Sequence, residues 1–171
     1  MQGIKYKFIL SDKVNLEQLL PDLFRILHSN MSLIAPTGCL YEDDYEMWSS
    51  CIIPAMEKEA RQIALMYSEG RIVGYFQYYI NLETKSLMME EIQILKEHQG
   101  TGIFADFYKW LVRHLSDDIV FVEAYAHKNN IKSQGILKNL GLTCSGENKN
   151  GNSFYYKGRY ADLLSKYLQE K

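Results

Sequence analysis

Two closely spaced glycines, Gly100 and Gly102, stand between an apolar run typical of a strand and a run typical of a helix. Such a junction presents successive backbone N–H groups and the positive end of a helix dipole to an anion. Glycine suits it because a Cβ would obstruct close approach and because positive φ is accessible. The P-loop consensus is absent, and the dinucleotide pattern G-x-G-x-x-G fails because no third glycine follows Phe104. The junction is therefore either a plain tight turn or a phosphate cradle of another type.

Two adjacent carboxylates, Glu90 and Glu91, lie on the run that leads into this junction. Neighbouring residues of a strand point to opposite faces, so only one of the two can face a bound acceptor. Burial would raise the pKa of that carboxyl toward the range of a general base. We favour Glu90, which alternation places on the same side as Ile92 and Ile94, and keep Glu91 as the second candidate. The alternative is that both are ordinary solvated or paired strand residues.

The elements that must position these residues follow from hydrophobic periodicity and turn residues. Ser11 is a plausible N-cap for the first helix, Pro21 divides that helix or begins a second turn, and Pro54 kinks or interrupts the second helix. Residues 68–70 join two strands as a hairpin, and Gly141 follows a helix as its C′ residue. The predicted strands are 4–10, 61–70, 71–83, 86–95, 118–127 and 152–160, and the predicted helices are 11–30, 41–53, 102–115, 130–141 and 161–169. The order predicts a single α/β domain, mixed α+β in character, over residues 1–171.

Composition narrows the classes of function. The 19 basic and 21 acidic side chains give a net charge of −2, which argues against a nucleic-acid partner. The N-terminal residues lack the pattern of a signal peptide and no apolar run is long enough to span a membrane, so we expect a cytoplasmic protein without a membrane partner. The three scattered cysteines, Cys39, Cys51 and Cys144, have no zinc spacing, and we expect no metal.

Two segments in this order and spacing are similar to a known family. The first, Gln99-Gly100-Thr101-Gly102-Ile103, resembles the Q/R-x-x-G-x-G/A signature of the GNAT acyltransferase superfamily. The second, "NNIKSQGILKNLGL" at residues 129–142, resembles the family's second motif, whose positions fall on Asn130, Ser133, Ile136, Leu137, Lys138, Gly141 and Leu142. The likeness covers about residues 4–142. It implies a central mixed, mostly antiparallel sheet of six to seven strands flanked by helices, and acetyl-CoA as co-substrate.

The resemblance also implies roles for named residues. Backbone groups of Ile92 and Ile94 would hold the pantetheine arm, and Asn130 would hydrogen-bond to it with Ser133 nearby. The pyrophosphate would be held by the backbone amides of six consecutive residues: Gln99, Gly100, Thr101, Gly102, Ile103 and Phe104. Glu90 or Glu91 would take the proton from the acceptor amine.

Two positions depart from the family pattern. Phe104 stands where glycine or alanine is usual, so its ring should crowd the phosphate unless it turns into the core. Leu137 stands where many members carry the tyrosine that protonates the departing thiolate, and leucine cannot donate a proton. Tyr125 or Cys144 could supply that proton, although a core tyrosine and a buried thiol are the simpler interpretations.

Other polar residues are weaker candidates. His127, at the end of a predicted strand, could act as a base, although such a histidine usually lies at the surface. His98 adjoins the glycine junction and could simply be exposed, and His28 and His114 lie in helices without evident partners. The acidic run "YEDDYE" at residues 41–46 could attract a cationic amine. We favour the interpretation that this run forms a helix N-terminus, where the helix dipole stabilises acidic side chains.

Three functions remain open. The first is an acetyl-CoA-dependent N-acetyltransferase that acts on a primary amine of a small molecule or a peptide, with a homodimer possible. The second is a non-catalytic acyl-CoA-binding module of the same fold. The third is an interaction protein that kept the fold and lost the cofactor.

Overall fold

The computed structural model describes residues 5–11, 15–58 and 61–168. The predicted strand start at Ile4 and helix end at Gln169 lie outside the described residues. The strands are β1 (Tyr6–Leu10), β2 (Gln62–Ser68), β3 (Arg71–Asn81), β4 (Ser86–Ile94), β5 (Phe121–His127), β6 (Thr143–Glu147) and β7 (Ser153–Arg159). The helices are α1 (Leu16–Met31), α2 (Tyr41–Lys58), the 3-10 turn η2 (Lys96–His98), α3 (Ile103–Val112), α4 (Ile131–Asn139) and α5 (Tyr160–Leu168).

The seven strands form one sheet in the order β1-β2-β3-β4-β5-β7-β6. The pairs β1–β2, β5–β7 and β6–β7 are antiparallel, and β4–β5 is parallel. This parallel ladder pairs Ser86–Met89 with Phe121–Ala124, and β4 then continues to Ile94. The predicted fold class, a mixed and mostly antiparallel sheet with helices, is confirmed.

Several predicted details were wrong. Ser11 does not cap α1: its N–H donates to the carbonyl of Ile63 at 2.7 Å, and the N-cap residue is Asn15. The first helix is not divided at Pro21 and the second is not interrupted at Pro54, since α1 runs through Pro21 and α2 runs through Pro54 to Lys58. The strand β6 was not predicted, because all five of its residues are exposed and no apolar alternation marks it.

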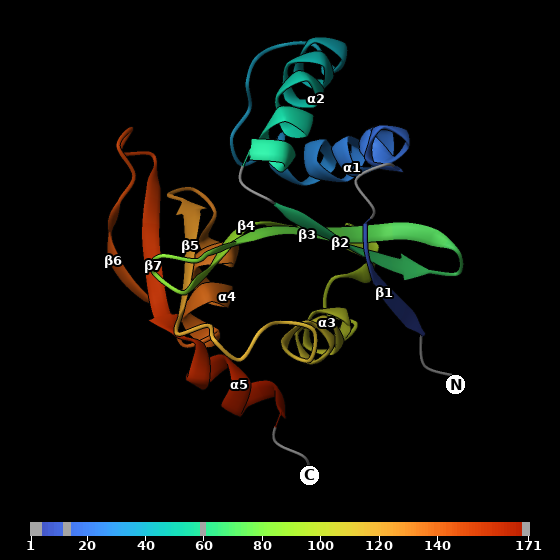
Figure 1. The fold of residues 1–171 in the computed structure, drawn as a ribbon. Coiled ribbons are helices and arrows are strands. Elements are labelled where there is room, and N and C mark those ends of the chain that lie inside the picture. Colours follow the sequence, from blue (N-terminus) through green and yellow to red (C-terminus); the bar gives the residue numbers. More distant parts are fainter. Residues whose placement is uncertain (1–4, 12–14, 59–60, 169–171) are drawn as a thin grey trace. The chain divides into compact units, whose positions relative to one another are not determined.

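Tertiary contacts divide the chain into two compact units. The first runs to Gln77 and includes Glu91–Phe104, and the second contains Tyr78–Glu90 and the chain from Ala105 onward. Within the first unit, α1 and α2 lie together over β2 and β3 (Figure 1).

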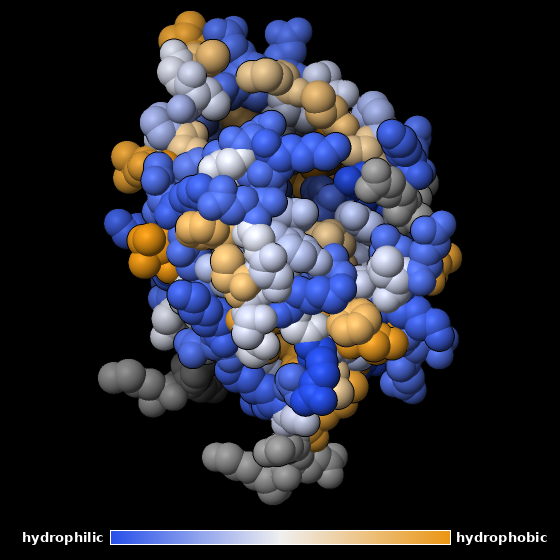
Figure 2. Space-filling model, turned by 90° about the vertical axis from the view of Figure 1, so that its left-hand side faces the viewer, coloured by the Kyte–Doolittle hydropathy of each residue, from blue (hydrophilic) through white to orange (hydrophobic). Residues whose placement is uncertain are grey.

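Among the described residues, no helix is both long and apolar enough to cross a membrane. Hydrophilic residues cover most of the face in Figure 2, and hydrophobic residues lie between them in small groups. The large apolar side chains are mostly inside the units.

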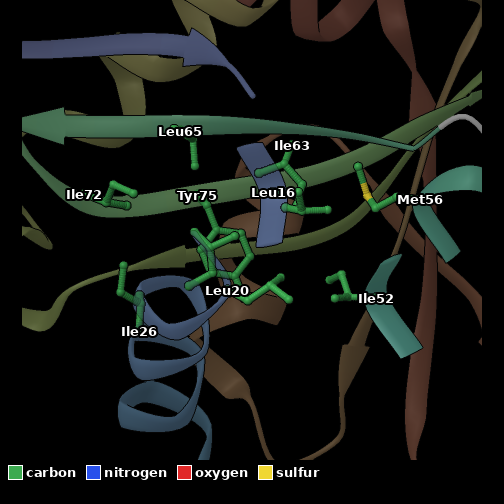
Figure 3. Close-up of a cluster of buried hydrophobic side chains, with 10 residues drawn as sticks. Leu16, Leu20, Ile26, Ile52, Met56, Ile63, Leu65, Ile72 and Tyr75 are labelled. Atoms are coloured by element: carbon green, nitrogen blue, oxygen red, sulfur yellow. The ribbon is translucent and has the colours of Figure 1, made fainter. Parts of the chain in front are cut away.

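The core of the first unit lies between α1, α2, β2 and β3. Amphipathic α1 contributes Leu16, Leu20, Leu23 and Ile26, α2 contributes Ile52 and Met56, and the strands contribute Ile63, Leu65, Ile72 and Tyr75. Figure 3 shows the side chains of Tyr75 and Leu20 close together in this cluster. Burial of each large side chain contributes about 1.5–3 kcal/mol, so this cluster holds the two helices on the strands.

The core of the second unit includes fully buried Leu87, Phe107, Val122 and Tyr156. The hydroxyl of buried Tyr108 in α3 donates to the sulfur of Met89 in β4 at 3.4 Å. The contact between Tyr108 and Met89 joins α3 to β4 within this unit.

Candidate functional site

The glycine segment, residues Gln99–Gly102, follows η2 and leads directly into α3. The φ angles of Gly100 and Gly102 are +79° and +93°, in the region that L side chains rarely adopt. A Cβ built at either glycine would have no heavy atom within 4 Å. Glycine is therefore required by the backbone conformation, and the space beside the segment is open.

Side chains tie this segment to its own unit. The Gln99 side-chain amide donates to the carbonyl of Ile94 at 2.8 Å, and the Thr101 hydroxyl donates to the carbonyl of His98 at 2.6 Å. The Tyr6 hydroxyl from β1 lies 2.7 Å from the Thr101 hydroxyl. These hydrogen bonds therefore hold the backbone amides of the glycine segment in place within the first unit.

The end of β4 presents backbone groups at two edges. The Leu95 N–H donates to β3, and backbone groups alternate between edges along a strand, so Ile92 and Ile94 direct theirs away from β3. The Ile94 carbonyl already accepts from Asn30 at 3.1 Å and from Gln99 at 2.8 Å. A ligand at this edge would therefore use the N–H of Ile94 and both backbone groups of Ile92.

Glu91 belongs to a chain of hydrogen bonds in the first unit. Its carboxylate accepts from Gln93 at 3.1 Å, and Gln93 in turn accepts from Asn30 at 2.9 Å. Burial raises the pKa of the Tyr75 phenol well above its ordinary value, and the charge and proximity of the Glu91 carboxylate add to the shift. Glu91 is thus already engaged by neighbouring polar groups.

Glu90 lies instead in a cleft of the second unit. This cleft has a volume of about 230 Å³ and is lined by Tyr79, Met88, Met89, Glu90 and Tyr125. Tyr125 is 49% exposed. The predicted base and a phenol that can donate a proton therefore line one small open cleft.

A polar cluster lies beside this cleft on β4, β5 and β7. The Glu123 carboxylate accepts from Ser86 at 2.8 Å and pairs with Lys157 at 3.0 Å. Burial acts to raise the pKa of Glu123, but hydrogen bonds from Lys157, Ser86 and Tyr155 outweigh it and lower the pKa. Burial and the Glu123 carboxylate raise the pKa of Tyr155, whose ring packs 5.2 Å from that of Tyr125. This cluster supports Tyr125 from the side.

The start of α4 is held by its own side chains. The Asn130 amide oxygen accepts from the Ser133 N–H at 3.0 Å, an N-cap that satisfies one of the free donors of the first turn. A pantetheine contact by Asn130 would therefore use its side-chain NH2. Leu137 is 8% exposed and packs in the core.

Four expectations for other residues were wrong. Tyr125 is not a core tyrosine and Cys144 is not a buried thiol, since both are exposed at strands that border solvent. His28 has partners, with its ring 4.8 Å from Tyr41 and 5.7 Å from Phe24. The ring of His114 stacks on a neighbouring tryptophan at 4.4 Å.

The His127 ring is held by the turn that follows β5, where its Nδ1 accepts a hydrogen bond from the Asn129 N–H at 3.1 Å. Its role as a base stays a prediction.

The acidic run lies at the beginning of α2, as the favoured interpretation predicted. Glu42, Asp43 and Asp44 occupy its first turn. Asp44 is 9% exposed, and one carboxylate oxygen accepts from the Thr37 hydroxyl at 2.6 Å. The run therefore has a structural role in joining α2 to the loop before it.

The structure groups the predicted site residues by unit. The first unit holds Glu91, Ile92, Ile94, Gln99, Gly100, Thr101, Gly102, Ile103 and the half-buried Phe104, and the second holds Glu90, Asn130 and Ser133. Sequence reasoning missed Tyr6, and it favoured sheet core for the aromatic run at residues 75–79, of which Tyr79 lines the cleft. No motif marks Tyr6, because its partners lie more than 90 residues away.

The chain is similar to known proteins in structure. No protein-family model matches the sequence, and no curated protein is similar to it in sequence. An acetyltransferase from Thermus thermophilus superposes with a TM-score of 0.71 at 17% identity, over 93% of this chain and 99% of that one.

Two further structures extend the likeness. Aminoglycoside acetyltransferase AAC(6')-Ib, crystallised with coenzyme A, has a TM-score of 0.66 at 14% identity, over 94% of this chain and 98% of that one. A variant of the spermidine N-acetyltransferase SpeG from Vibrio cholerae has a TM-score of 0.60 at 13% identity, over 93% and 96%. At such identities the likeness shows a shared fold.

Proposed function

We propose that this chain, which has the fold of the GNAT acetyltransferases, transfers the acetyl group of acetyl-CoA to a primary amine. The observation that carries the proposal is the open glycine segment at the start of α3, with Gly100 and Gly102 both at positive φ. A neighbour with this fold is crystallised with coenzyme A. We also propose that residues 1–171 form one domain, since β3 and β4 each run through both compact units.

The cofactor would be held mainly by backbone groups. The amides from Gln99 to Phe104 and the N-terminal end of α3 would bind the pyrophosphate. Backbone groups of Ile92 and the N–H of Ile94 would bind the pantetheine arm, with the Asn130 side-chain NH2 and Ser133 close to it. When bound, acetyl-CoA supplies an activated acyl group with a thiolate as leaving group.

Residues that line the cleft of the second unit would accept and donate the protons of the reaction. The amine nitrogen attacks the thioester carbonyl carbon, the new C–N bond forms, and the C–S bond breaks. We assign removal of the amine proton to Glu90, with Glu91 as the alternative, and delivery of a proton to the departing sulfur to Tyr125. Glu91 is the second candidate, and its carboxylate lies in the first unit beside Gln93 and Tyr75.

The lining of this cleft suits a basic acceptor. The rings of Tyr79 and Tyr125 beside the Glu90 carboxylate provide the surroundings that an alkylammonium group prefers. One structural neighbour is crystallised with kanamycin, and another is a spermidine N-acetyltransferase. Kanamycin and spermidine both carry primary amines. The acceptor would be a small-molecule amine or a peptide N-terminus.

The test combines calorimetry and a turnover assay. Titration with acetyl-CoA should show binding, and a CoA-release assay over a panel of primary amines should show turnover with at least one. Binding without turnover on any amine would favour the alternative, a non-catalytic acyl-CoA-binding module. Absence of acetyl-CoA binding would rule out both the acetyltransferase and the acyl-CoA-binding module. An interaction protein would then be the remaining function.

A further inference from the structure

Three residues join the first strand to the glycine segment. The Tyr6 hydroxyl on β1 lies 2.7 Å from Thr101 Oγ1 and 3.2 Å from His98 Nδ1, and Thr101 Oγ1 lies 2.6 Å from the carbonyl oxygen of His98. The rings of Tyr6 and His98 also meet edge to face, with centroids 5.9 Å apart. We call Tyr6, His98 and Thr101 the Tyr6 clasp.

The direction of each hydrogen bond in the clasp follows from donor chemistry. A carbonyl oxygen only accepts, so the single Thr101 hydroxyl proton must go to His98. Thr101 Oγ1 must then accept from Tyr6, which uses the Tyr6 proton. The Tyr6 oxygen is left to accept from Nδ1–H of His98, which fixes the histidine tautomer. The three bonds form a closed ring in which every proton is assigned.

We propose that Tyr6 is a positioning residue that fixes the glycine segment in its anion-binding conformation. The proposal rests on the proposed function, because it takes the pyrophosphate of a CoA thioester as the anion. Since the Thr101 proton is used within the clasp, Thr101 offers the phosphate only its backbone N–H. Thr101 therefore acts on the cofactor through the backbone of the segment.

The geometry of the segment explains why it needs this support. Gly100 and Gly102 flank Thr101, and glycine has the largest conformational freedom of any residue. Gln99 holds the segment at one end through Ile94, and the clasp holds it between the two glycines. Tyr6 is itself fixed, because β1 pairs with β2 with Tyr6 opposite Ser68.

The test uses Tyr6→Phe, which keeps the ring and removes the hydroxyl. We expect hydrogen exchange of the amides in residues 99–102 to speed up, and the affinity for CoA to fall roughly 3- to 10-fold, the effect of one net hydrogen bond. The kcat/KM for acetyl-CoA should fall by a similar factor, whereas the kcat/KM for acetyl-pantetheine, which lacks the pyrophosphate, should not change. Tyr67→Phe, which removes a phenol hydroxyl from β2 next to β1, is the matched control and should change none of these values.

Variants of Thr101 test the same ring independently. Thr101→Ser keeps the hydroxyl and should retain wild-type affinity, and Thr101→Val should match Tyr6→Phe. The double variant should be no worse than either single one, because each breaks the same ring.

Several outcomes separate this proposal from the proposed function. If Tyr6→Phe changes neither the hydrogen exchange of residues 99–102 nor the affinity for CoA, the proposed role of the Tyr6 clasp is wrong. An equal loss for acetyl-CoA and acetyl-pantetheine would also overturn it, because that pattern reports general destabilisation. If the wild-type chain binds no CoA, the proposed function fails and the positioning of a CoA site fails with it. Exchange at residues 99–102 would then show whether Tyr6 still orders the segment.

Discussion

Substitution of Gly100 by alanine separates the cost of backbone strain from the loss of a ligand site. Gly100 has φ of +79° and no heavy atom within 4 Å of a built Cβ, so alanine would clash with nothing and would only be strained. An L residue in the left-handed region costs about 1–2 kcal/mol. For a chain of this size that corresponds to a fall in Tm of about 2–8 °C.

Gly70, in the hairpin between β2 and β3, is a closely matched control. Its φ is +78° and the space at its Cβ position is also empty. Gly70→Ala and Gly100→Ala should therefore lose similar stability in thermal or denaturant unfolding. Only Gly100→Ala should weaken CoA binding, by about tenfold if the segment relaxes away from positive φ to relieve 1–2 kcal/mol of strain.

The assay is calorimetric titration of CoA at a temperature at which both variants are fully folded. Equal CoA affinities for Gly100→Ala and Gly70→Ala, with equal losses of stability, would refute the assignment of the glycine segment to the pyrophosphate. A much larger loss of stability for Gly100→Ala would show instead that the space beside the segment is not open.

Three further predictions concern the base, the sheet and the pH dependence of stability. Glu90→Gln should lower kcat by roughly 10²- to 10⁴-fold with little change in acetyl-CoA affinity, and an unchanged rate would remove Glu90 as the base. Gly74→Ala should destabilise the fold by about 1–3 kcal/mol in denaturant unfolding, because its Cβ would lie 2.7 Å from the backbone oxygen of Gln93; a neutral effect would contradict this packing. The folded-state pKa of Glu123 is below its ordinary value of 4.5, so its pairing with Lys157 stabilises the fold above that pH and is lost as the pH falls through the lower folded value. Glu123→Gln should flatten the stability profile in that acidic range, and an identical profile would show that the pair contributes nothing.

Much of the fold could be predicted because local signals agreed with burial. The hairpin at Glu69-Gly70 has the positive φ angles expected of its turn residues, and Gly141, predicted as a C′ residue, has φ of +91°. The predicted division of the first helix at Pro21 and interruption of the second at Pro54 were wrong. Each proline lies on an exposed side of its helix, where water can hydrogen-bond to the carbonyl that the missing proline N–H leaves free. Around Pro54, buried Ile52 and Met56 hold both halves of α2 on the core.

The candidate site was only partly predictable for a related reason. Adjacent motif residues such as Gln99 and Gly102 carry a signal in their spacing, and so does the N-cap Asn130. Contacts between distant residues carry none. The exposure of Tyr125 and the link from Tyr6 to Thr101 depend on which strands become neighbours, which no local pattern in this sequence records.

The edge strand β6 has a consequence for assembly. A sheet edge can pair with a strand from another molecule, and proteins oppose this with short, irregular and charged edges. β6 has five residues, shifts register between Cys144 and Gly146, and ends at Glu147, which pairs with Lys128 at 2.8 Å. We therefore expect that a homodimer of this chain, if one forms, does not continue the sheet through β6 and uses side-chain surfaces elsewhere.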